Sequence, residues 1–252
     1  PSAANSLPFI WWEKLDGTVL ATSQTYSDDI GSDQTWIARY ATKYDGFADG
    51  LSSGDWYEYE SLDGQVSFDE SGGVLNFVST AGDSRAATYL AKEWALSTGS
   101  DFKTTIDWHL QGPASADTAL WFGVTASETE QQLLAVRDNN GTSTYELMTD
   151  APVIASVPVA RVATSGVFYV AYDTSADELY FSTIGFGQSA DPDNTWIFTG
   201  LIQGTWSASG IKIIFGGQSD GTNSAGDATF DEFLLIDGSL LVPTTHEITV
   251  TS

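Results

Sequence analysis

Oxygen-bearing side chains gather around one late segment of the chain, Gly226 to Gly238, which reads GDATFDEFLLIDG. Asp231 and Glu232 interrupt an otherwise apolar strand pattern there, and the loop before it supplies further polar ligands, Asp220, Asn223 and Asp227. Hard oxygen ligands in a flexible loop suit Ca²⁺. The pattern predicts a structural calcium site that includes Asp231. The alternative is that these side chains only form turns and cap backbone amides.

A second group of residues has the chemistry of a sugar-binding surface. In DFKTTIDWHLQ, the alternation predicts a strand whose polar face carries Lys103, Asp107 and His109. In ALWFGVTA, the same pattern turns Trp121 away from the core. Sugars stack on aromatic rings and form hydrogen bonds with carboxylates or imidazoles. We therefore predict a ligand-binding face made of Trp121, Asp107, His109, Lys103 and Arg137.

The N-terminal segment offers a different explanation for Trp121. It contains Trp11 and Trp12, and such an aromatic pair is more often buried than displayed. That segment could lie over Trp121, in which case the polar residues near it merely face solvent.

These residues require strands to position them. Short alternating segments separated by Gly, Asn, Asp and Ser recur along the chain, which is typical of an antiparallel sandwich. Turns are expected at 139–141 and 174–177, and the segments 210–217 and 228–238 supply two late strands. The last of these is expected to return beside the N-terminal part of the domain. The segment 85–97 suits either a helix or a strand.

The strand pattern defines one domain with two additional ends. Residues 44–238 form the expected jelly-roll sandwich, and residues 1–43 form an apolar arm that packs on its own or a neighbouring domain. Residues 239–252 end in HEITVTS, which alternates like one more strand.

The charge of the chain limits its partners. Nine basic residues against 34 acidic residues give a net charge of −25, which disfavours nucleic acid and anionic membrane surfaces.

No stretch approaches the roughly 20 apolar residues of a membrane span. The chain has no cysteine, so it has no thiolate metal site and no cysteine nucleophile. It begins at Pro1, which is compatible with a removed signal peptide and equally with other trimming of the chain, and we expect an extracellular or surface-associated protein.

Two segments resemble concanavalin A-like lectin and glucanase domains. They are the opening YDGFADGLSSGDWYEYESLDGQVSFDESGGVLNFVS from Tyr44 and the closing ATFDEFLLIDG, and the likeness covers about residues 44 to 238. The resemblance implies an all-β, antiparallel two-sheet jelly roll with a glycan site on a concave sheet. It also implies a calcium ion that ties the first strand to the last. Asp45 and Asp49 would then join Asp231 as metal ligands.

The sequence does not match the catalytic pattern that this resemblance implies. Laminarinase-type members carry two glutamates flanking an aspartate on one strand, because a retaining glycosidase needs two carboxyl groups about 5 Å apart. Glu58 and Glu60 have no aspartate between them. Asp231 and Glu232 are adjacent, so a regular strand would turn them to opposite faces. We therefore expect no enzyme activity.

Three hypotheses follow for the function. The first is a non-catalytic, lectin-like domain that binds a polysaccharide or glycan, with Ca²⁺ as a structural ion. The second is a self-assembling structural subunit of a filament, surface layer or virion, which adds its N-terminal arm or C-terminal strand to a neighbour's sheet. The third is a glycan-cleaving enzyme.

Overall fold

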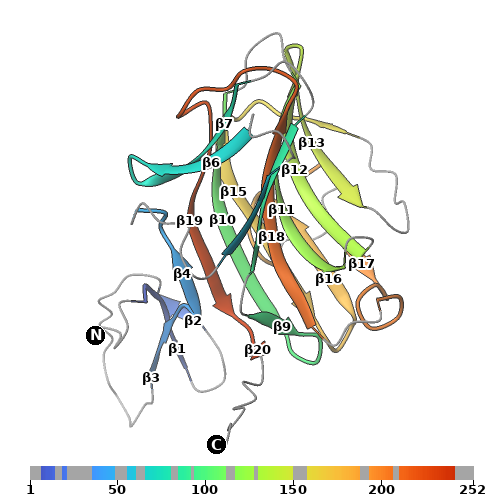
Figure 1. Cartoon of the computed structure of the whole chain (residues 1–252). Coiled ribbons are helices and arrows are strands. Elements are labelled where there is room, and N and C mark those ends of the chain that lie inside the picture. The colour runs from blue at the N-terminus through green and yellow to red at the C-terminus, as the bar shows by residue number, and fades with distance from the viewer. Residues whose placement is uncertain are drawn as a thin grey trace, which may run out of the picture.

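The computed structural model describes residues 7–14, 19–21, 36–48, 56–60, 66–80, 85–91, 94–111, 117–127, 130–149, 158–187, 193–206 and 210–241. Two antiparallel sheets lie face to face and form a sandwich (Figure 1). The all-β class and the two-sheet architecture expected from the sequence are therefore confirmed. No helix in the described ranges is long and apolar enough to cross a membrane.

The first sheet, here named the β10 sheet, contains both early and late parts of the chain. Its order is β17 (Thr195–Thr199), β16 (Glu178–Ser182), β15 (Ser165–Asp173), β10 (Phe102–Leu110), β19 (Ala228–Asp237), β7 (Val74–Ser79) and β6 (Val66–Ser71). The short strand β4 (Lys43–Asp45) also pairs with β19. The last long strand thus returns beside the first strand of the sandwich, as predicted.

The second sheet, the β11 sheet, faces the first. Its order is β14 (Val159–Ala160), β13 (Thr142–Thr149), β12 (Glu130–Asn139), β11 (Asp117–Ser127), β18 (Gly210–Ser219), β8 (Arg85–Ala91) and β5 (Trp56–Glu60). β9 (Ala95–Ser97) pairs with β18 and with β20 (Leu240–Leu241). Segment 85–97, which suited a helix or a strand, therefore forms the strands β8 and β9.

The ends of the chain differ in how much is described. In the arm, β1 (Phe9–Lys14), β2 (Val19–Ala21) and β3 (Trp36–Tyr40) form a separate small sheet, drawn near β4 in Figure 1. The arm joins the sandwich where the backbone N–H of Thr42 donates to the carbonyl of Leu235 at 2.6 Å. At the other end only β20 is described, and HEITVTS lies outside the described residues.

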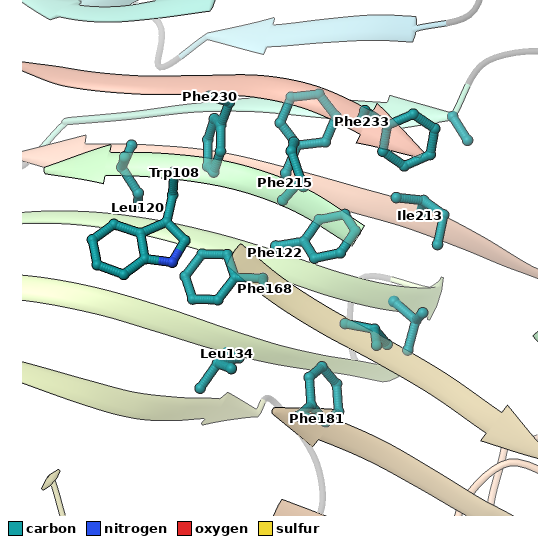
Figure 2. Close-up of a cluster of buried hydrophobic side chains, with 14 of the residues drawn as sticks. Trp108, Leu120, Phe122, Leu134, Phe168, Phe181, Ile213, Phe215, Phe230 and Phe233 are labelled. Atoms are coloured by element: carbon teal, nitrogen blue, oxygen red, sulfur yellow. The ribbon is translucent and has the colours of Figure 1, made fainter. Parts of the chain in front are cut away.

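Aromatic and aliphatic side chains from both sheets fill the space between them (Figure 2). Trp108 from β10 and Phe168 from β15 have ring centroids 5.7 Å apart. Phe122 from β11 lies 6.4 Å from Phe168, so rings of the two sheets meet at the centre. The predicted hairpin turns also form: Asn140 and Gly141 have φ of 48° and 84°, values that Asn and Gly tolerate.

The strand β19 contains a β-bulge at its two acidic residues. On β10, Thr105 and Asp107 are two positions apart, whereas their partners on β19, Leu234 and Asp231, are three apart. Glu232 takes up the extra position with a φ of 48°. Phe230 and Phe233, on either side of the acidic pair, are both buried in the core.

The bulge corrects one expectation from the sequence. Because both flanking phenylalanines point into the core, Asp231 and Glu232 together lie on the outer side of the sheet rather than on opposite faces. A strict two-residue period does not hold across the inserted residue.

Candidate functional site

The sequence-predicted sugar-binding residues lie on two different surfaces. Phe102, Ile106 and Trp108 face the core, so Lys103, Asp107 and His109 lie on the outer face of the β10 sheet. Trp121 on β11 and Arg137 on β12 belong to the other sheet. The five residues therefore do not form the single face expected, because the alternation within each strand does not reveal which sheet the strand joins.

Trp121 lies outside the main core but is not open to solvent. Leu120 and Phe122 face the core, while Trp121 belongs to a second apolar cluster with Leu133, Ala135 and Ile214. The residue is only 6% exposed. The expected direction of Trp121 is correct, but its ring presents no open surface on which a sugar could stack.

Arg137 is held by two carboxylates on the outer face of the β11 sheet. Its Nε donates to Asp117 Oδ1 at 2.6 Å, and its Nη2 donates to the other oxygen of Asp117. Its Nη1 donates to Glu146 Oε2 at 3.2 Å. All three guanidinium nitrogens thus donate to carboxylates of the protein, two of them in a bidentate pair with Asp117, and few donors remain for a ligand.

Three carboxylates gather at the bulge on the outer face of the β10 sheet. Asp107 lies directly opposite Asp231 in the register of β10 and β19. Glu232 follows in the bulge and accepts a hydrogen bond from the Tyr44 hydroxyl at 3.1 Å. Like charges directly opposite each other on neighbouring strands are destabilising, so stability alone does not explain this arrangement.

The environment of these carboxylates changes their acidity. Burial, followed by the negative charges of Asp231 and Glu232, raises the pKa of Asp107 to about 6. Burial also raises the pKa of Asp231, while the backbone N–H of Glu232, which donates to Asp231 Oδ1 at 2.8 Å, acts in the opposite direction. Asp107 is thus a carboxyl group that titrates close to neutral pH.

Aromatic rings lie beside the carboxylates. Tyr169 pairs with Thr105 between two core residues of β15, so its ring lies on the outer face. The Phe186 ring meets it edge to face, with centroids 5.1 Å apart, and Lys103 Nζ lies 6.0 Å from the Phe186 centroid. The Tyr180 hydroxyl holds the loop that carries Phe186, by donating to the carbonyl of Gly185 at 2.7 Å.

We name this surface the acidic-aromatic face. It consists of Tyr44, Lys103, Asp107, His109, Tyr169, Phe186, Asp231 and Glu232. Sequence reasoning missed Tyr44, Tyr169 and Phe186. The alternation in GVFYVAYD was a usable signal for Tyr169, whereas Phe186 reaches the face through a loop and has no periodic signal.

The predicted calcium ligands are dispersed, and each described one has another role. Asp45 Oδ1 accepts from the N–H of Phe47 at 2.9 Å, and its Oδ2 accepts from the indole N–H of Trp56 at 2.8 Å. Asp231 lies at the bulge, opposite Asp107. Asp49 lies outside the described residues.

The loop residues of the same prediction support local turns. Asp220 accepts a hydrogen bond from the backbone N–H of Asp117, and Asp227 Oδ2 accepts from the N–H of Ser224 at 2.9 Å. Asn223 is buried and pairs through its backbone with Ser79. Within the described ranges, no three Asp, Glu or His side chains come together as a group that could hold a metal ion. The predicted ligands that the structure describes therefore do not fit the calcium site expected from the sequence.

Comparison with known proteins gives a fold but no sequence relative. No family model matches the sequence, and no curated protein matches it. Among solved structures, the CBM2 module of the evolved Dit of Lactobacillus casei BL23 phage J-1 matches with a TM-score of 0.53 and 8% identity, over 82% of this chain and 97% of that module. The basic winged bean lectin, solved with Tn-antigen, matches with a TM-score of 0.52 and 11% identity, over 80% of this chain and 98% of the lectin.

The topology and these matches define the class. The chain has the concanavalin A-like lectin fold, as the resemblance in its first and last strands implied. At such low identity the likeness is one of fold, and the function must be argued from the surface of this chain.

Proposed function

We propose that the chain is a non-catalytic carbohydrate-binding domain and that the acidic-aromatic face is its binding surface. The observation that carries this proposal is the position of Tyr169 near Asp107 on one outer sheet face, with the Phe186 ring packed against Tyr169. Aromatic rings offer stacking surfaces for the apolar face of a sugar, and carboxylates accept hydrogen bonds from its hydroxyl groups. The lectin and the carbohydrate-binding module that share the fold support the same class of ligand.

The charge of the face narrows the ligand. Asp107, Asp231 and Glu232 outnumber Lys103, and the whole chain carries a net charge of −25. An anionic polysaccharide would be repelled, so the ligand is a neutral or cationic glycan. The half-buried Asp107 is the group that a sugar hydroxyl would reach between the rings and the bulge.

Two surface variants test this assignment. Asp107→Asn replaces the central carboxylate, and Gln218→Ala is a control on β18, in the other sheet. On a glycan array, the wild-type chain and Gln218→Ala should bind the same glycans, whereas Asp107→Asn should lose most of the signal. Equal binding by all three proteins would refute the role of Asp107. Melting curves of each variant separate lost binding from lost folding.

A glycan-cleaving activity is the second candidate, favoured by one observation. The pKa of Asp107 is raised beside other carboxylates. Neighbouring carboxyl groups with different pKa values are typical of catalytic sites in which one group acts as the general acid and its partner stays ionised. Release of reducing sugar from a polysaccharide panel, abolished by Asp107→Asn, would establish catalysis. We place binding first because the sequence lacks the known catalytic pattern of this fold.

Assembly through the chain ends remains a separate proposal, as does the extracellular or surface location. Most of the N-terminal arm between residues 15 and 35, and the end of the C-terminal segment after residue 241, lie outside the described residues.

A further inference from the structure

The edges of the two large sheets differ in how they are protected. An open edge strand can pair with another chain, and proteins usually prevent this with charges, proline, bulges or very short strands. At the other edge of the β10 sheet, β6 carries Asp69 and Glu70. In the β11 sheet, β5 carries Glu58 and Glu60, and β14 is only 2 residues long.

The edge strand β17 has none of these protective features. Its five residues, TWIFT, include no charge and no proline, and it pairs with β16 without any register shift. No strand in the described part of the chain pairs with its other side. Phe198 faces the core, whereas Ile197 lies on the outer side and is 42% exposed.

A second copy of this chain is the partner that fits this edge. The strand is self-complementary in an antiparallel arrangement centred on Ile197, which would place Thr195 opposite Thr199 and Trp196 opposite Phe198 of the other copy. Such opposed Thr and aromatic pairs stabilise neighbouring strands. The same alignment places Asp193 opposite Leu201, so no acidic residue faces another across residues 193–201.

Electrostatic repulsion does not prevent this pairing. Two copies each carry a net charge of −25 and can approach closely only along an uncharged surface. In the proposed alignment the two Asp193 residues are eight strand positions apart, or about 27 Å at about 3.4 Å per residue. This exceeds the Debye length of about 8 Å at physiological ionic strength, so their repulsion is largely screened.

We propose that the chain forms a two-fold symmetric dimer by antiparallel pairing of β17 with β17 of a second copy. The pairing joins two eight-stranded β10 sheets into one continuous sheet. The two-fold axis is perpendicular to the sheet, so the outer faces of both copies lie on the same side. A multivalent glycan would then meet two acidic-aromatic faces at once and bind with higher avidity. The dimer itself does not depend on the proposed carbohydrate function.

Engineered cysteines test the geometry, because the chain has none of its own. Opposed residues in an antiparallel pair have Cα atoms about 4.5–5.5 Å apart, within the range that a disulfide bridges. Ile197→Cys should therefore form a covalent dimer under mild oxidation. Ile184→Cys is the matched control, since Ile184 is 50% exposed but lies in the loop after β16. It should stay monomeric on a non-reducing gel.

Sedimentation velocity of the full chain tests the dimer without oxidation. Wild type should shift with concentration from 27.0 kDa to twice that mass. Because the edge is smaller than a standard interface, we expect a Kd on the order of 10–100 μM. Ile197→Lys should raise the Kd at least tenfold, and Ile184→Lys should leave it unchanged.

The contrary outcomes are distinct. A wild-type monomer throughout, or a dimer that Ile197→Lys does not weaken while Ile197→Cys fails to cross-link, would overturn the proposal. The second result would point instead to pairing through the chain ends. Melting curves for both lysine variants confirm that any change reflects association rather than unfolding.

Discussion

Asp107→Asn should stabilise the folded chain at neutral pH while it weakens glycan binding. The half-buried carboxylate lies opposite Asp231 and near Glu232, and its pKa is raised from 3.8 to about 6 by burial and then by those charges. At pH 7 the folded protein must hold Asp107 ionised in a place that disfavours the charge. The amide of asparagine has nearly the same shape and carries no charge, so it removes this cost.

The sign and size of the effect follow from the pKa. Between about pH 6 and pH 4, folded Asp107 binds a proton that the unfolded chain does not, so its contribution to stability falls as pH rises through this window. The rise in pKa sets an upper limit of about 3 kcal/mol at 1.36 kcal/mol per pKa unit. Because the side chain is half exposed and solvent screens it, we expect about 1 kcal/mol.

Thermal melting at a series of pH values measures this difference. For a chain of this size, about 1 kcal/mol corresponds to a rise in Tm of about 2–4 °C at pH 7. The gain should vanish near pH 4, where wild-type Asp107 is itself protonated. Asp173→Asn is the opposite control. Hydrogen bonds from Ser175 and Ala176 lower the pKa of Asp173, so its replacement should reduce Tm at pH 7.

Two results would show that ionised Asp107 does not destabilise the fold. A lower Tm of Asp107→Asn at pH 7 would show that the carboxylate stabilises the fold. A gain of equal size at pH 4 and pH 7 would show that the effect does not come from ionisation. The double variant with Asp231→Asn should gain less than the sum of the single variants, because both relieve the same repulsion.

Three further predictions concern packing, a buried hydrogen-bond group and metal. Trp121→Ala should lower the free energy of unfolding by about 3 kcal/mol in urea, because a buried ring leaves a cavity; unchanged stability would mean that the ring is dispensable. Asn76→Ala should cost about 2 kcal/mol in the same assay, since Asn76 Nδ2 donates to the carbonyls of Asp69 and Ser71 and its Oδ1 accepts from Gly226 N–H at 2.7 Å; an unchanged midpoint would contradict this. EDTA should leave Tm within about 1 °C, because we expect no bound ion, and only the removal of an ion that binds the folded chain would lower Tm; a rise in Tm on addition of Ca²⁺ would restore the calcium hypothesis.

Local patterns predicted the strands well because burial of one face leaves a period of two in the sequence. Phe102 to Leu110 alternates as the core requires, and the segment forms β10 over that range. The return of the last strand beside the first was also predicted, from the resemblance and from Greek-key topology.

The assembly of the site was much less accessible from the sequence. Nothing in the alternation reveals that β10 and β11 enter different sheets, so Trp121 was wrongly grouped with Asp107. The bulge at Glu232 inserts one residue, and a strict period then assigns the wrong face. Phe186 arrives through a loop that the Tyr180 hydroxyl fixes, a tertiary contact with no periodic signature.

We propose that the outer face of the β10 sheet binds carbohydrate. Affinity electrophoresis in native gels cast with soluble neutral and cationic polysaccharides tests it most directly, with wild type, Phe186→Ala and Gln218→Ala run side by side. We expect that at least one polysaccharide retards wild type and Gln218→Ala, and that Phe186→Ala migrates as it does in a gel without polysaccharide. Equal retardation of all three proteins, or retardation of none in any gel, would contradict it.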